Sequence, residues 1–188
     1  MLPDPIHPVV VHFPIVLAVA LPAFAGVSLW SIARGKAFRK AWVLPTVLAG
    51  TLTLSSLVAL KTGQAQEDRV ESIVGEAPIH RHEEAAEIFL TLSVGLFLLT
   101  GAGLLGGRVG TGARYGATLG AAALLVAGIQ VGGSGGDLVY RHGAGQAYAQ
   151  ETPGAPTLSG GRSEYDESEH RTLRSREAGS HEGREARS

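Results

Sequence analysis

Four long apolar segments constrain the fold of this chain more than any other feature. They occupy roughly residues 9–32, 41–60, 84–105 and 116–136. Each is close to the ~20 residues that an α-helix needs to cross a hydrocarbon core. Because a backbone in lipid must satisfy its own hydrogen bonds, such segments cross as helices. The sequence therefore predicts an all-α integral membrane protein built as a four-helix bundle.

The composition divides the chain into two domains. Residues 1–145 contain the four apolar segments and predict the transmembrane domain. Residues 146–188 are rich in Gly, Ser, Glu and Arg and have few large apolar side chains, so they cannot bury a core. Ordering such a segment costs conformational entropy that contacts must offset. We expect a polar, low-complexity, extended tail, with residues 150–188 packed on a partner.

The charges of the loops predict the orientation of the bundle. The first loop, residues 34–40, carries only basic charges, and the third carries Arg108 and Arg114 without an acid. The second loop, residues 64–78, is mainly acidic. By the positive-inside rule the first and third loops are cytoplasmic. Both termini then lie outside, which in a bacterial inner membrane is the periplasm.

Several classes of function are disfavoured by what the sequence lacks. It has no cysteine, which excludes disulfides, thiolate metal sites and covalent haem attachment. A net charge of -1 gives no electrostatic reason to expect nucleic acid. The sequence has no metalloprotease motif that would indicate an enzyme, and it has no charged pair within a span that would indicate an ion path. We expect no nucleic-acid partner and no catalytic activity of the chain's own.

Histidines gather at one predicted end of the bundle. Titratable groups at the mouth of a span usually mark function. Neutral imidazole ligates zinc, copper and iron, and it is an axial ligand of haem. The spacing does not choose between haem b and a transition metal. The histidines at the outer helix ends are His7, His12, His80, His82 and His142.

We expect three of these histidines to form the site. His7 and His12 are five residues apart, which places them roughly 140° apart around a helix, so they cannot share one stripe. We favour His12 as the residue that points into the bundle, where it would meet His82 and His142. The alternatives are that these histidines cap carbonyls freed by Pro14, lie at headgroup level, or serve a proton or quinone site.

Two charged residues are predicted to support the site. Glu83 follows His82 directly and is a candidate hydrogen-bond partner for that ligand. Arg141 precedes His142 and is a second candidate, although it could instead anchor the interface or pair with Asp137 four residues earlier.

Two end motifs resemble those of a known family. Residues 7–15 read HPVVVHFPI and residues 135–143 read GGDLVYRHG. They resemble the end motifs of a widespread bacterial family of four-helix membrane proteins of unknown function, some of which occur joined to or near cytochrome c-type modules. The resemblance covers about residues 5–145, and residues 62–65 and 82–87 match more loosely. It implies an association with electron transfer in a bacterial inner membrane.

Two functions are compatible with these features. In the first, the chain is an accessory or structural subunit of a larger bacterial electron-transfer complex, respiratory or photosynthetic, whose tail packs on partners at the outer face. Its partners would be the lipid bilayer and other membrane subunits. In the second, it is a b-type haem- or metal-binding membrane redox protein that uses the outer-face histidines.

Overall fold

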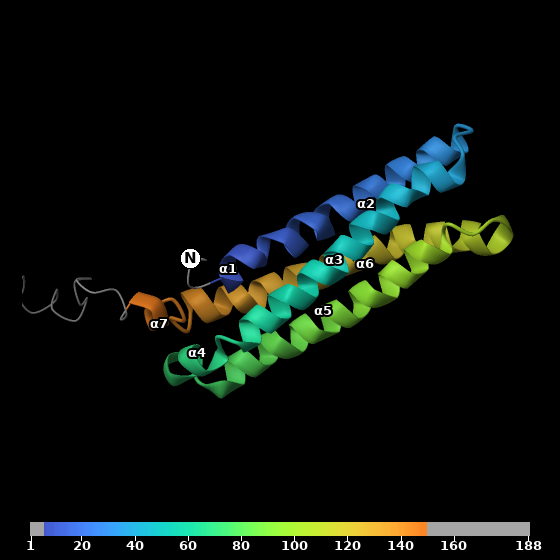
Figure 1. Cartoon of the computed structure of the whole chain (residues 1–188). Coiled ribbons are helices and arrows are strands. Elements are labelled where there is room, and N and C mark those ends of the chain that lie inside the picture. Colours follow the sequence, from blue (N-terminus) through green and yellow to red (C-terminus); the bar gives the residue numbers. More distant parts are fainter. Residues whose placement is uncertain (1–5, 150–188) are drawn as a thin grey trace, which may run out of the picture. The chain divides into compact units, whose positions relative to one another are not determined.

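The computed structural model describes residues 6–149, and this part of the chain is all α-helical, as predicted (Figure 1). The partner contacts predicted for residues 150–188 lie outside the described residues. The helices are α1 (His7–Val10), α2 (His12–Ala33), α3 (Phe38–Gln64), α4 (Glu67–Val74), α5 (Glu76–Ala102), α6 (Gly107–Tyr140) and α7 (Gln146–Ala149).

Four of the helical segments are long and apolar enough to cross a membrane, so the chain is a multi-pass membrane protein. They extend beyond the predicted apolar segments at most of their ends; α6, for example, begins at Gly107 and ends at Tyr140. A helix can continue beyond its apolar core, because its backbone hydrogen bonds form equally well where the side chains are polar and lie outside the lipid. An apolar run therefore marks the centre of a span better than it marks its ends.

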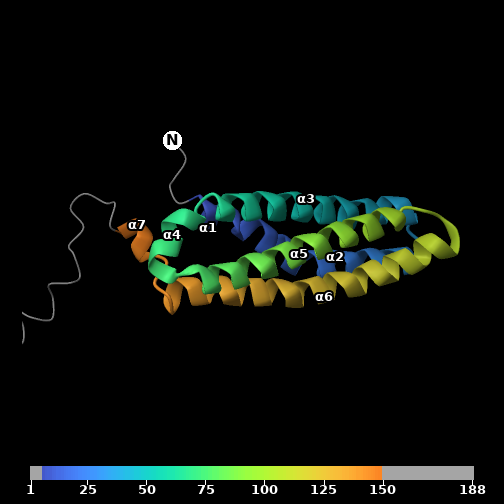
Figure 2. The same ribbon diagram turned by 90° about the horizontal axis from the view of Figure 1, so that it is seen from below.

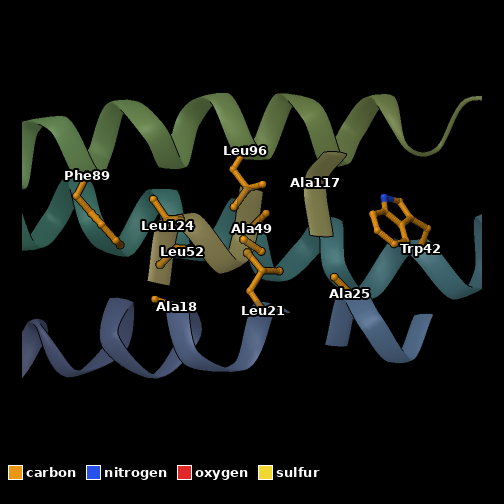
Figure 3. Close-up of a cluster of buried hydrophobic side chains, with 11 residues drawn as sticks. Ala18, Leu21, Ala25, Trp42, Ala49, Leu52, Phe89, Leu96, Ala117 and Leu124 are labelled. Atoms are coloured by element: carbon orange, nitrogen blue, oxygen red, sulfur yellow. The ribbon is translucent and has the colours of Figure 1, made fainter. Parts of the chain in front are cut away.

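Alanines are interspersed with larger apolar side chains in the interior of the bundle, and many other large side chains face outward. Phe13, Leu98 and Leu119 are more than half exposed, as lipid-facing residues are expected to be. In lipid no hydrophobic effect joins helices, so small residues that let backbones approach closely stabilise the contacts. Figure 3 shows the interior cluster, which consists of Ala18, Leu21, Ala25, Trp42, Ala49, Leu52, Phe89, Leu96, Ala117, Ala121 and Leu124.

Trp42 is the largest fully buried side chain in the described residues. Its indole Nε1–H donates to the Thr100 carbonyl of α5 at 3.0 Å. The hydroxyl hydrogen of Thr46 is shared between the Trp42 carbonyl, at 3.1 Å, and the same Thr100 carbonyl, at 3.3 Å. The two bonds to Thr100 tie α3 to α5 near the turns of the bundle.

Trp42→Phe should lower the free energy of unfolding by about 1–3 kcal/mol, because it removes one buried hydrogen bond and part of a buried ring. Thermal unfolding of the purified protein in detergent measures this change. Trp30→Phe is the matched control, since Trp30 is 59% exposed and should change stability by less than about 0.5 kcal/mol. Equal destabilisation by the two variants would contradict the role assigned to Trp42.

The bundle consists of two similar hairpins. The first is formed by α2 and α3 and the second by α5 and α6; α3 packs against α5, and α2 packs against α6. Buried residues of α5 recur 75 positions after those of α2, and buried residues of α6 recur 72 positions after those of α3. The first set of pairs is Pro14 and Phe89, Ala18 and Ser93, Leu21 and Leu96, Ala25 and Thr100. The second set is Trp42 and Arg114, Pro45 and Ala117, Ala49 and Ala121, Leu52 and Leu124.

The two hairpins run in the same direction. Both hairpin turns lie at one end of the bundle, and α1 and α4 lie at the other, as Figures 1 and 2 show. Parallel repeats of this kind are related by an axis along the bundle. We name the end with α1 and α4 the histidine end, and the end with the turns at residues 34–37 and 103–106 the basic end.

Candidate functional site

The imidazole of His7 is held by the end of α3. His7 is half-buried, and its Nδ1 lies 2.9 Å from the Ala59 carbonyl oxygen and 3.3 Å from the Thr62 hydroxyl. A carbonyl oxygen only accepts, so Nδ1–H is the donor of the shorter bond. The proton of a neutral His7 ring is therefore on Nδ1, and Nε2 keeps a free lone pair.

The imidazole of His82 is held in the same way by the end of α6. Its Nδ1 lies 2.9 Å from the Ser134 hydroxyl oxygen. That hydroxyl has one hydrogen, and it donates to the Val131 carbonyl at 2.9 Å. Ser134 must therefore accept from Nδ1–H of His82. His82 has the same tautomer as His7, again with a free lone pair on Nε2.

The two imidazoles meet between the hairpins. Their ring centroids are 6.5 Å apart, and the ring planes are inclined by 81°. Each ring packs against a glycine of its own hairpin: a methyl group at Gly63 would lie 3.1 Å from Cε1 of His7, and one at Gly135 would lie 3.1 Å from Cε1 of His82. His7 and His82 are separated by the same 75 positions as the buried residues of α2 and α5. The histidines are thus equivalent members of the repeat.

His12 does not point into the bundle, so this part of the sequence prediction is wrong. It lies on the exposed outside of α2. Pro14, Ala18 and Leu21 form the buried stripe of that helix. Seven residues before Pro14 is about two full turns, which places His7 on the stripe, whereas His12 lies roughly 160° away from it. The heptad spacing from His7 to Pro14 and Leu21 is the sequence signal that identifies the inward histidine.

The predicted triad of histidines does not assemble. His142 lies at the end of α6, and its Nδ1 donates to the Asp137 carbonyl at 3.0 Å. Within residues 6–149, no three His, Cys, Asp or Glu side chains come together in a way that could hold a metal ion. Of His12, His82 and His142, only His82 faces another imidazole.

The two supporting residues also have other partners. Glu83 accepts from Gln64 Nε2 at 2.6 Å, which ties α5 to α3 beside the site. Arg141 Nε lies 3.2 Å from Asp137 Oδ1, the pairing that the sequence offered as an alternative. That ion pair is exposed and contributes at most about 1 kcal/mol. The groups that hydrogen-bond the paired imidazoles are instead the Ala59 carbonyl and the Ser134 hydroxyl.

Acidic side chains are frequent in α4 and in the first turns of α5, at the histidine end of the bundle. Partial desolvation raises the pKa of the Glu67 carboxyl, and the negative charges of Glu83 and Glu71 raise it further. Such carboxylates make the local potential negative. This potential favours a positively charged metal centre at the histidine end.

Among the described residues, the site brings together two imidazoles and no third potential metal ligand. Structural zinc requires four protein ligands, which the described residues do not provide. Two imidazoles suit a centre that obtains its other ligands elsewhere, and haem iron is such a centre because it takes only axial ligands from the protein.

Fold and site together define a multi-pass α-helical membrane protein with a pair of imidazoles between two like hairpins. No family model, curated protein or solved structure matches the chain. Its function is therefore inferred from its own residues, and the resemblance carried by the two end motifs stays a prediction.

Proposed function

We propose that this protein is a membrane electron carrier in which Nε2 of His7 and Nε2 of His82 hold one b-type haem. The opposition of the two imidazoles supports this proposal most directly. A metal–nitrogen bond of about 2 Å on each side, with roughly 1 Å more to each ring centre, gives centroids about 6 Å apart. The observed separation of 6.5 Å is close to that distance.

The surroundings of the pair are compatible with a flat macrocycle. α3 presents Ala59 and Gly63 at this level, and α6 presents several glycines near Gly135. Helix ends with so few side-chain atoms place little bulk beside the two rings. Both histidines are only partly exposed, which also suits a haem that is bound without covalent links.

The hydrogen bonds of the two rings have a direct chemical role. Donation from Nδ1–H to Ala59 and Ser134 fixes each ring's orientation and makes Nε2 a stronger ligand. When bound, the haem would supply one-electron redox chemistry. If His7 and His82 both bound the haem, they would leave it no free position for oxygen or substrate. This arrangement favours electron transfer over catalysis.

The loop charges support a site at the outer face of a bacterial inner membrane. Residues 34–40 and Arg108 lie at the basic end, which the positive-inside rule assigns to the cytoplasm. His7 and His82 then face the periplasm, where a soluble or membrane-bound redox protein would exchange electrons with the haem. An accessory role within a larger respiratory or photosynthetic complex is compatible with this proposal and stays a prediction.

Purified full-length protein, titrated with haemin in detergent, should bind about one haem per chain and develop a Soret band and sharp reduced α and β bands typical of two axial histidines. Absorption spectroscopy and elemental analysis measure this together. A tightly bound metal ion without a Soret band would overturn the haem assignment while keeping the histidine site. Protein that binds neither haem nor a metal ion would overturn both.

A further inference from the structure

We propose that the basic end contains a second site, which binds a phosphate group of a lipid headgroup. The site is an open cavity of about 510 Å³ between the end of α2 and the start of α3. It is separate from the histidine pair and does not depend on the haem. The residues that line it are Ser28, Ser31, Lys36, Ala37, Lys40 and Ala41.

Two buried hydroxyls are the most informative part of the cavity. Ser28 is 6% exposed and Ser31 is 9% exposed. Every other serine and threonine in residues 6–149 donates its hydroxyl hydrogen to a helix carbonyl three or four positions earlier. Among the described serines and threonines, Ser28 and Ser31 alone have a hydroxyl without a hydrogen bond. In this part of the chain, every side-chain oxygen that is fully enclosed has a hydrogen-bond partner. The hydroxyls of Ser28 and Ser31 have none, so they are not fully enclosed and reach the cavity that these residues line.

The start of α3 adds backbone donors to the same cavity. Its N-cap residue is Ala37, which has no side chain that could cap the helix, and the first turn contains no acidic residue. The first N–H groups of a helix have no partner within it. Together with the positive end of the helix dipole, they favour an anion. Ala37 and Lys40 bring this helix end into the lining of the cavity.

The charge of the first hairpin points to the same class of ligand. Lys36 and Lys40 line the cavity, and residues 6–66 contain no Asp or Glu that could neutralise them. The cavity thus combines two ammonium groups, two hydroxyls and free N–H groups without an acidic acceptor. A phosphate has enough oxygens to accept from such a set, whereas a carboxylate has only two. The position at the end of membrane-spanning helices makes a lipid headgroup the nearest source.

Ser28→Ala combined with Ser31→Ala tests the site without changing any charge. Full-length protein in a neutral detergent would be titrated with phosphatidylglycerol, and binding would be followed by native mass spectrometry and by the shift in melting temperature. Because hydrogen bonds to a charged group are strong, the double variant should bind at least about tenfold more weakly than wild type. Arg39→Ala is the matched control: it removes a neighbouring charge outside the cavity lining and should change binding by less than about twofold.

A second variant keeps the test decisive if the double variant is unstable. Lys40 is exposed, so Lys40→Gln should leave the fold intact and weaken binding severalfold. Binding of phosphatidylglycerol but not of inorganic phosphate supports a lipid headgroup. Equal protection by inorganic phosphate, lost in the Lys40→Gln and serine variants, would overturn the lipid as the source while keeping the phosphate site. Unchanged binding by the serine and Lys40 variants, or an equal loss in Arg39→Ala, would overturn the site.

Discussion

His7→Ala and His82→Ala should each abolish the six-coordinate haem spectrum and weaken haem binding by at least about 100-fold. Each substitution removes one of the two proposed ligand atoms, Nε2 of His7 or Nε2 of His82, whose rings have centroids 6.5 Å apart. Loss even of a group that only orients a metal ligand typically costs 10–100-fold in affinity, so loss of the ligand itself costs more. Haemin titration followed at the Soret band measures the change.

Two other histidines of the same end serve as controls for this experiment. His12 is exposed on the outside of α2, and His142 bonds to the carbonyl of Asp137 at the end of its own helix. His12→Ala and His142→Ala should therefore bind haem like the wild type. The reverse pattern, with haem lost in His12→Ala and kept in His7→Ala, would contradict the assignment of the ligands.

Ser134→Ala extends the same experiment to the support of a ligand. It removes the acceptor of the His82 Nδ1–H bond without touching Nε2. Haem should still bind, with an affinity about 10–100-fold lower.

Gly110→Ala should destabilise the bundle strongly, by more than about 3 kcal/mol, or prevent folding. A methyl group at this position would overlap the carbonyl of Leu105 in the turn that precedes α6. Overpacking in a core typically costs 1–3 kcal/mol when side chains can move, but a backbone carbonyl in a tight turn cannot yield in that way. Thermal unfolding in detergent, compared with yield in the membrane fraction, measures the effect.

The neighbouring Gly112 gives this prediction an internal control. A methyl group there meets nothing within 4 Å. Because alanine is the better helix former, Gly112→Ala should leave stability unchanged or raise it by about 0.5–1 kcal/mol. Stability changes of opposite sign at two glycines only two positions apart are expected only if contact with Leu105, and not helix propensity, decides the outcome. Similar effects at the two positions would contradict that explanation.

The number and type of the long helices could be predicted from the sequence because lipid imposes a simple rule. A span must be apolar over about 20 residues, and that property is visible without knowledge of the partners of a side chain. The ends could not be predicted equally well, because a helix such as α6 continues through glycines and polar residues once it has begun. The predicted orientation of the termini depends on loop charge and stays a prediction.

The site was predicted only in part, for a geometric reason. The gathering of histidines at one end indicated where to look, and the rotation between His7 and His12 correctly indicated that both could not face inward. Choosing between them required the buried stripe that continues through Pro14, Ala18 and Leu21. The partners of the rings could not be predicted, because a backbone carbonyl at Ala59 has no signature in sequence. Aligning the sequence with itself at an offset of 72 residues pairs Gly63 with Gly135, and an offset of 75 residues pairs His7 with His82.

Each hairpin contributes one imidazole and the glycine against which that imidazole packs, so a single hairpin contains half of the site. The chain is in this sense a tethered dimer, with α4 and its flanking residues as the tether. Because both halves belong to one chain, they associate within one molecule and need not meet by diffusion in the membrane. The effective concentration of one half near the other is then in the millimolar range or above. Joining the halves also frees them to diverge, and Trp42 and Arg114, at equivalent positions, have done so. The two hairpins thus carry the same residue at the histidine pair, whereas at the equivalent positions of Trp42 and Arg114 they carry different ones.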